Sequence, residues 1–172
     1  MGARDSVLVG AAGEDYVLYR LHRMGLLAAA CPLNAYAADI IVFSPAMQVG
    51  CMVQVKTRTT GADHGWHMGE KHERLIHPRL FYVFLDLQPD HPESYVMPSD
   101  VVSKAVAGSH RAWLALPGQG GRVRRDSPMR RIAPVFHDAV PGFPAGWMDA
   151  YRERWDYLTS DVPTPVEGAE MS

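Results

Sequence analysis

The strongest pattern in the sequence is a continuous apolar run at residues 80–87, which is typical of a strand buried on both faces. A shorter strand is predicted at 93–97, across a proline-rich turn. Two further apolar and β-branched runs, at 38–43 and 49–57, are separated by a short turn. Their spacing predicts that these two runs form a β-hairpin.

The segments before and after these strands have the periodicity of helices. Apolar residues recur at helical spacing between residues 10 and 27, and Ser6 is the candidate cap of that helix. Ser99 is the candidate cap of a second helix that runs to about residue 107 and that residues 110–116 extend or follow. Aromatic residues at helical spacing predict a last helix over 146–158.

The remaining segments are less regular. Residues 59–79 are rich in glycine and histidine and predict a loop that leads into a short helix near 70–76. We expect a core over 1–116, an irregular extension of the same domain over 117–159, and a flexible tail over 160–172. The order of the elements predicts an α/β or α+β fold, built around a mixed sheet flanked by helices.

Composition narrows the class of protein. The 172 residues include 17 Lys and Arg against 19 Asp and Glu, and 47% of the chain is hydrophobic. These values exclude a disordered polyelectrolyte, a collagen-like repeat and a disulfide scaffold. The formal net charge of −2 also excludes a protein that coats nucleic acid by bulk electrostatics, so any contact with DNA or RNA must use a local patch.

The sequence shows neither a secretory leader nor a membrane span. The first residues lack a basic segment followed by an apolar one, and no stretch approaches about 18 uninterrupted apolar residues. Cys31 and Cys51 stand alone, as buried cysteines of a reduced cytosol do. We therefore expect a cytoplasmic protein with no membrane partner.

Four polar residues occupy positions where the surrounding pattern is apolar. Glu14 lies on the first predicted helix, and Asp39 begins the first hairpin strand. Gln54 and Lys56 lie on the second hairpin strand, and they share one face of it because strand side chains alternate. Hairpin pairing can bring Asp39 beside them. The pattern predicts a compact group of carboxylates, an amide oxygen and an ammonium.

Such a group suits the hydrolysis of a phosphodiester. A hard divalent cation, Mg²⁺ or Mn²⁺, binds oxygen ligands. The candidate ligands are the side chains of Asp39, Gln54 and Glu14 and the backbone oxygen of Val55. A bound cation polarises the phosphoryl group and lowers the pKa of a bound water. Lys56 beside it can position or deprotonate that water and offset charge in the transition state.

Each of these residues also has a purely structural interpretation. Glu14 suits an early turn of a helix, where the helix dipole favours an acid, and Asp39 suits the turn before a strand. Gln54 and Lys56 alternate with valines, as on any half-exposed strand. We favour the site because all four residues fall at one predicted place.

The order of these residues, Glu14, then Asp39, then Gln54-x-Lys56, resembles the PD-(D/E)XK nuclease superfamily, which has the restriction-endonuclease-like fold. The resemblance covers about residues 10–107. It implies an αβββαβ core and a magnesium-dependent hydrolase that acts as a nuclease. It also implies that Asp39 and Gln54 hold the metal, that Lys56 is the catalytic lysine, and that Glu14 supports the metal or orients water.

The chain departs from the family pattern at two positions. Gln54 replaces the acid of the acid-x-Lys pair, and Ala38 stands where the family has a proline before the aspartate. Gln54 leaves two carboxylates where three stand in the family, which predicts weaker metal binding. A second hypothesis is therefore a catalytically inactive nuclease-fold module that binds nucleic acid or a protein partner.

A cluster of arginines lies outside the predicted core. Residues 121–131 contain five arginines and one aspartate in a chain of net negative charge. The five are Arg122, Arg124, Arg125, Arg130 and Arg131. They are the candidate contact with a nucleic-acid phosphate backbone, whereas the alternative is a solvated or self-paired loop.

Histidines crowd a second segment, between residues 64 and 77. No cysteine lies nearby, which disfavours a zinc site. We interpret the segment as a loop beside the active site, in which a histidine or Trp66 touches substrate.

The sequence as a whole favours a metal-dependent endonuclease that acts on DNA rather than RNA. A homodimer would supply two sites for the cleavage of two strands.

Overall fold

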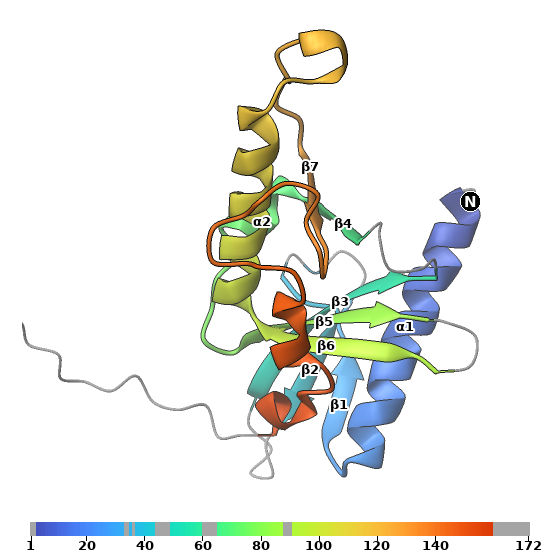
Figure 1. Ribbon diagram of the computed structural model, residues 1–172. Coiled ribbons are helices and arrows are strands. Elements are labelled where there is room, and N and C mark those ends of the chain that lie inside the picture. Colours follow the sequence, from blue (N-terminus) through green and yellow to red (C-terminus); the bar gives the residue numbers. More distant parts are fainter. Residues whose placement is uncertain are drawn as a thin grey trace, which may run out of the picture.

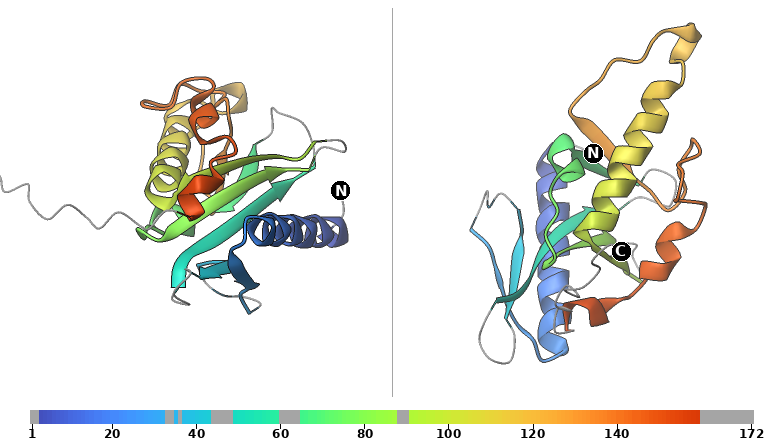
Figure 2. Two further views of the ribbon diagram at one scale, coloured as in Figure 1. Left: turned by 90° about the horizontal axis from the view of Figure 1, so that it is seen from below. Right: turned by 90° about the vertical axis from the view of Figure 1, so that its left-hand side faces the viewer.

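A five-stranded sheet with helices on both faces forms the centre of the protein (Figure 1). The structure is a computed structural model that describes residues 3–32, 35, 37–43, 49–59, 65–87 and 91–159. The strands in spatial order are β1 (Leu27–Ala30), β2 (Ile40–Phe43), β3 (Val49–Arg58), β5 (Leu80–Asp86) and β6 (Glu93–Pro98). α1 (Ala3–Arg23) and α2 (Ser99–Ala115) lie on opposite faces of this sheet (Figure 2).

Strand directions make the sheet mixed. β3 runs parallel to β5, and the other neighbouring pairs are antiparallel. The expected hairpin of residues 38–43 and 49–57 is present as β2 and β3, and the apolar run at 80–87 forms β5. The predicted α+β fold, with a mixed sheet flanked by helices, is confirmed.

Two apolar cores lie on the two faces of the sheet. On one face, Val53 and Val83 pack with Val17 of α1. On the other face, Tyr82 and Phe84 belong to the core that α2 covers. β5 contributes to both cores and is buried throughout, which is why its sequence does not alternate between apolar and polar residues.

α1 begins and ends earlier than its periodicity predicted. It already includes residue 3, so Ser6 lies inside the helix and does not cap it. At its end Gly25 adopts φ 78°, and the Leu26 N–H donates to the Leu21 carbonyl (3.0 Å). This left-handed glycine closes the helix and turns the chain directly into β1. β1 was not predicted, because its alanine-rich sequence has little strand propensity.

A second, two-stranded sheet stands outside the first. β4 (Trp66–Gly69) and β7 (Met129–Ile132) pair antiparallel, and neither strand was predicted. The short helix η1 (Glu70–Glu73) follows β4, within the segment predicted to be helical. The C-terminal half of α2, the turn η2 (Gln119–Gly121) and β7 extend away from the five-stranded sheet (Figure 1). We call residues 107–132 the α2–β7 arm.

α2 is one continuous helix, so residues 110–116 extend it rather than follow it. It begins at Ser99, but Ser99 does not cap it. The Ser99 hydroxyl instead accepts a hydrogen bond from the His77 N–H (3.0 Å) and donates one to the His77 carbonyl (2.9 Å). These bonds attach the loop before β5 to the start of α2.

The predicted last helix is wrong. The segment forms two short 3₁₀ helices, η3 (Trp147–Tyr151) and η4 (Trp155–Leu158). Between them Glu153 has φ 53°, and Arg152 forms a β-bridge with Tyr95 of β6. A regular helix permits neither feature, so contacts with the sheet override the aromatic periodicity.

The flexible tail expected at 160–172 lies outside the described residues. None of the helices in the described part of the chain has the length and apolar character needed to span a bilayer. Cys51 is buried, Cys31 is partly buried, and both are free thiols.

Candidate active site

The candidate site forms where β3 extends past the end of β2. β2 begins at Ile40, which pairs with Val53, whereas β3 continues beyond this pair. Asp39 precedes β2, and its N–H still donates to the Val53 carbonyl (2.9 Å). The Asp39 carbonyl accepts a hydrogen bond from the Cys31 N–H (2.7 Å). Backbone bonds on both sides therefore hold Asp39 opposite Gln54.

Two donors from β3 hold the Asp39 carboxylate. Its Oδ2 accepts a hydrogen bond from the Val55 N–H (2.7 Å) and a second from the side-chain amide of Gln54. Gln54 is only 5% exposed, so its amide faces this carboxylate rather than bulk solvent. The hairpin register thus brings Asp39, Gln54 and the backbone of Val55 together.

Lys56 lies on the same face of β3 as Gln54 and is partly buried. Burial lowers the pKa of Lys56; the charge of Asp39 opposes this shift, and the charge of Lys71 adds to it. The Lys56 ammonium therefore lies near a carboxylate and near a second cation. Its proton is lost more easily than that of a lysine in water.

Glu14 reaches the same strand edge from α1, on the opposite face of the sheet. The preceding residue, Gly13, is buried, and a Cβ there would stand 1.8 Å from Oγ1 of Thr57. Glycine allows α1 to approach β3 this closely, which places Glu14 at the edge that β2 leaves open. Burial and the charge of Asp39 raise the pKa of Glu14. The two carboxylates are therefore close enough to repel each other.

The donor atoms of this site are oxygens. Glu14 and Asp39 supply carboxylates, and Gln54 supplies an amide. Within the described ranges, no three or more His, Cys, Asp and Glu residues lie close enough together to hold a metal ion. Two mutually repelling carboxylates beside an amide suit a hard divalent cation, whose remaining positions water can fill. The residues present fit Mg²⁺ or Mn²⁺, with one charged ligand fewer than a site of three acids.

A buried histidine–tyrosine pair that the sequence did not predict lies beside the site. Tyr82 pairs in register with Gln54, and its hydroxyl lies 2.7 Å from Nδ1 of His72 in η1. Burial lowers the pKa of His72 to about 4, and the charges of Lys56 and Lys71 add to the shift. His72 is therefore neutral at pH 7. The sequence signal for Tyr82 was a hydroxyl within an otherwise apolar run.

One of the five predicted arginines, Arg130, is engaged inside the fold. Arg130 is 5% exposed, it is paired with Glu73 of η1, and its Nη1 lies 3.4 Å from Asp126. A guanidinium engaged inside the fold anchors β7 to η1. The structure thus gives Arg130 a role in holding the arm, and its contact with nucleic acid stays a prediction.

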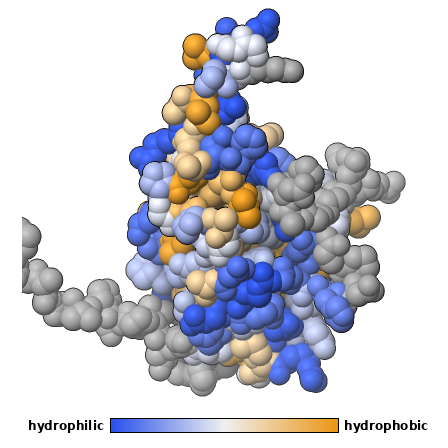
Figure 3. Space-filling model, viewed as in Figure 1, coloured by the Kyte–Doolittle hydropathy of each residue, from blue (hydrophilic) through white to orange (hydrophobic). Residues whose placement is uncertain are grey.

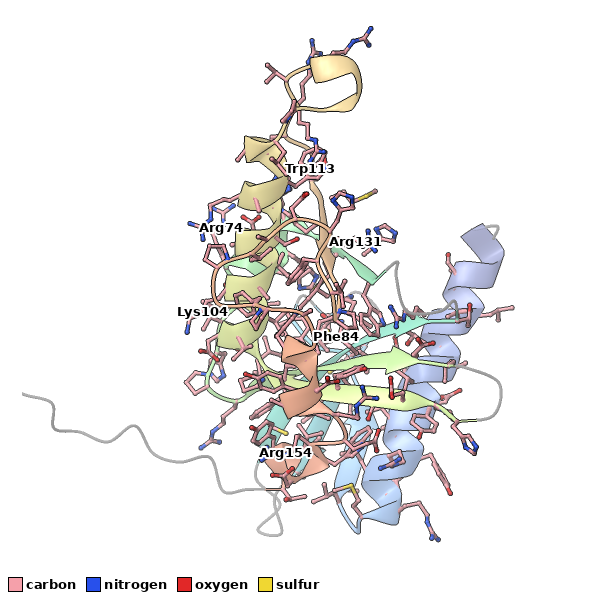
Figure 4. All side chains as sticks on the ribbon, viewed as in Figure 1. Arg74, Phe84, Lys104, Trp113, Arg131 and Arg154 are labelled. Carbon is pink, nitrogen blue, oxygen red and sulfur yellow. The ribbon has the colours of Figure 1, made fainter. Side chains whose placement is uncertain are left out.

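The other four arginines differ in their exposure and in their contacts. Arg122 and Arg125 are exposed at the end of the α2–β7 arm, and Arg131 is partly buried on β7. Arg124 donates to the Trp113 carbonyl (2.8 Å) and lies 4.9 Å from the centroid of its ring. The structure does not bring these arginines to the β3 edge; it carries them on the arm, away from the sheet (Figures 1 and 4).

The histidine-rich segment is also rearranged. Trp66 is buried in β4, where its Nε1 donates to the Leu85 carbonyl (3.1 Å) and the Arg58 guanidinium lies 4.0 Å from its ring. The interpretation of Trp66 as a substrate contact is therefore wrong. His67 is exposed on β4, and His64 lies outside the described residues.

No protein-family model matches the sequence, and no protein of curated function matches it. Among solved structures, the chain is similar to a bacterial homing endonuclease, I-Ssp6803I, with a TM-score of 0.50 and 16% sequence identity. The similarity covers 92% of each of the two chains. At this level of identity, the comparison establishes that the fold is similar to an endonuclease fold.

Proposed function

We propose that this protein is a Mg²⁺-dependent endonuclease that hydrolyses phosphodiester bonds of DNA rather than RNA. In this proposal its site is of the PD-(D/E)XK type, with Gln54 in place of the usual acid. The observation that carries the proposal is the contact of the Asp39 carboxylate with the Gln54 amide and the Val55 N–H, at the strand edge that Lys56 and Glu14 also approach. The endonuclease-like fold supports the same class of activity.

The metal would be held by oxygen atoms of Asp39, Gln54, Glu14 and the main chain of Val55. When bound, Mg²⁺ or Mn²⁺ supplies polarisation of the phosphoryl group and a water of lowered pKa. Gln54 has both a donor and an acceptor in its amide, so it can offer either its nitrogen to Asp39 or its oxygen to a cation. As a neutral ligand it binds a cation less strongly than a carboxylate does.

Lys56 would act on the attacking water and on the phosphate. Because burial lowers its pKa, its amine can take up the proton of a water molecule and serve as a general base. In its charged form the same group donates hydrogen bonds to phosphoryl oxygens and offsets the charge that develops in the transition state. Asp39 and Glu14 keep the charged form populated by their own negative charge.

The α2–β7 arm would supply contacts with the phosphate backbone. Arg122 and Arg125 are exposed at its end, in a chain whose net charge of −2 gives no general attraction to DNA. Binding in this proposal therefore depends on a local basic region. A homodimer would apply two such sites to the two strands of a duplex.

The proposal is tested by cleavage of plasmid DNA and of matched RNA and DNA oligonucleotides, with Mg²⁺, Mn²⁺ or EDTA. We expect cleavage of DNA only with a divalent metal, and we expect Asp39→Ala to abolish it. Asp15→Ala is the matched control, since Asp15 is an exposed acid on α1 next to Glu14. Undiminished cleavage by a clean preparation of the Asp39 variant would overturn the proposed site.

The second candidate function is a nuclease-fold module that binds nucleic acid without cutting it. The observation that favours it is the buried amide of Gln54 at the position where a third carboxylate would complete the metal site. Binding of DNA without cleavage, across a range of metals, would establish this alternative. Gln54→Glu then sharpens the choice: we expect it to increase metal affinity about tenfold in an active enzyme, measured by Mg²⁺ titration of the cleavage rate.

A further inference from the structure

A cavity of about 270 Å³ opens between α2, β7 and the segment that follows β7. The lining residues that matter for its chemistry are His67, Ser109, Trp113, Arg131, Phe136 and His137. Trp113 and Arg131 are on the arm, whereas Phe84 marks the core over the five-stranded sheet (Figure 4). The cavity thus lies between the arm, β4 and the segment that follows β7, and none of the residues of the β3 edge lines it.

Aromatic rings form its apolar walls. His110 is stacked on Trp113 with centroids 5.6 Å apart and an interplanar angle of 18°, and Arg124 lies 4.9 Å from the same indole ring. Phe136 also lines the cavity and is stacked on Trp147, which lies outside the lining, at 5.9 Å and 11°. Because each ring is held by neighbours, the cavity is already formed without a ligand.

A cation and a histidine stand side by side at the cavity. Arg131 of β7 lies directly opposite His67 of β4 in the strand register. Directly opposed residues of an antiparallel pair project from the same face, so both side chains border the same space. An anionic group at this place meets a guanidinium and an imidazole.

Two acids also line or border the cavity, and both are engaged. Asp126 lies 2.7 Å from Nε2 of His110. Asp138 lies 2.9 Å from Nδ1 of His137 and 3.9 Å from Nη1 of Arg124. Each of the two acids therefore already has a hydrogen-bonding partner within the protein.

The apolar character continues onto the rim. Met129 is 60% exposed and Val135 is 58% exposed, and both residues line the cavity. Figure 3 shows apolar residues, in orange, among polar ones along the arm. Exposed apolar side chains around a preformed aromatic cavity indicate a binding surface rather than a solvated face.

We infer that this cavity receives one unpaired nucleobase of a nucleic-acid strand, with the adjoining phosphate on Arg131 and His67. The inference rests on the proposed function, which makes the partner a nucleic acid. It adds the form of that substrate, which is a single strand or a duplex with one base turned out. Bases stack on aromatic side chains in proteins that bind single strands, and arginine contributes a further contact.

The size and chemistry of the cavity favour a base over other ligands. A volume of about 270 Å³ is just below the range of about 300–1,000 Å³ for sites of drug-sized ligands, which suits a single base better than a larger cofactor. Ser109 and Ser127 offer hydroxyls that can donate to or accept from the edge of a base. A flat apolar ring, a polar edge and an adjacent negative charge are the features of a nucleotide.

The test uses the full chain and a DNA single strand that contains 2-aminopurine, whose fluorescence reports stacking. We expect binding to quench the fluorescence, and we expect Ser109→Trp, which fills the cavity, to weaken binding about tenfold and remove the quenching. Ala115→Trp adds the same ring to the exposed end of α2, outside the lining residues, and should change neither. Phe136→Leu, checked for folding by circular dichroism, removes one aromatic wall and should reduce quenching.

An abasic strand separates this inference from the proposed function. Equal affinity of the wild-type protein for abasic and base-containing strands would overturn the nucleobase pocket and leave the nuclease proposal intact. Displacement of the strand by equimolar free 2-aminopurine nucleotide would overturn a strand-bound base in favour of a mononucleotide. Failure to bind either strand would overturn both the pocket and the proposed DNA partner.

Discussion

The β3 edge and the α2–β7 arm carry opposite chemistry and are held in different ways. At the β3 edge, Asp39 and Gln54 are positioned by the backbone bonds of a hairpin, and two carboxylates lie near a partly buried lysine. The arm carries exposed arginines, and stacked rings and ion pairs hold it. The difference shows how a net charge of −2 can conceal an acidic site and a basic surface in one small protein.

The short helix η1 connects these two regions. His72 of η1 lies against Tyr82, beside the candidate site. The next residue, Glu73, pairs with Arg130 of the arm, and its carbonyl accepts a hydrogen bond from Ser103 of α2. Because one turn of chain contacts both regions, a change in the anchoring of the arm can reach the β3 edge.

The largest expected effect is that of Lys56→Met, which keeps the apolar stem and removes the amine. It should distinguish the role of the β3 edge in cleavage from the role of the arm in binding. We expect the rate of DNA cleavage to fall about 10²–10⁴-fold, as for the loss of a general base, while the affinity for DNA stays within about twofold. Single-turnover cleavage and a binding isotherm measure the two quantities. Lys104→Met is the matched control, because Lys104 is exposed on α2 and paired with Asp100. Equal rates for the two variants would contradict a catalytic Lys56.

Arg130→Met should be the most destabilising substitution among the arginines of the arm. It leaves Glu73 without its partner in a partly buried setting, which should lower the free energy of unfolding by about 2–3 kcal/mol. Urea denaturation measures the change, with Arg122→Met, an exposed arginine at the end of the arm, as the control. If both variants unfolded at the same urea concentration, Arg130 would not be an anchor.

His72 should make the stability of the β3 edge depend on pH. Its pKa in the folded protein is about 4, below the ordinary value of 6.5, so the unfolded chain binds the proton more readily. The stabilisation is fully present above pH 6.5 and is lost as the pH falls through 4, with a total of about 3 kcal/mol. Unfolding at pH 7 and at pH 4.5 should show a smaller difference for His72→Asn than for the wild type. His67→Asn, at an exposed histidine, should retain the wild-type difference.

The smallest effect should come from the double substitution Arg122→Ala and Arg125→Ala. Each lost phosphate contact should reduce the slope of log affinity against log salt by about 0.9, so the pair should reduce it by about 1.8. The cleavage rate at saturating DNA should not change, because the β3 edge is untouched. Arg23→Ala, at the exposed end of α1, should leave the slope as it is. An unchanged slope in the double variant would remove these arginines from the interface.

Much of the central sheet was predictable, and the strands outside it were not. The β2–β3 hairpin and β5 follow from dense apolar and β-branched runs in the sequence. β4 and β7 are four residues each, and they pair across a long stretch of chain, from Trp66 to Ile132. Unlike β2, these two strands contain no run of apolar β-branched residues, and burial by a distant partner decides that they form.

The arrangement of the candidate site was likewise predictable only in part. The proximity of Asp39 to Gln54 was predictable, since hairpin register places them opposite each other. Glu14 was predicted at the same place, but the cause of its approach, the contact between Gly13 of α1 and Thr57 of β3, could not be read from the sequence. The burial of Arg130 was equally hidden, since its partner Glu73 lies on another element.

The sequence by itself determined the elements with a local cause: the hairpin, the buried strand, the helical periodicity of α1 and α2, and the polar residues that break an apolar pattern. Tertiary structure alone decided which of those polar residues meet, which arginine is buried, and that two short strands and an aromatic cavity form beside α2. The physical reason is that periodicity and turn chemistry act between neighbours in the chain. Ion pairs, ring stacks and the pairing of short strands depend instead on partners that only folding brings together.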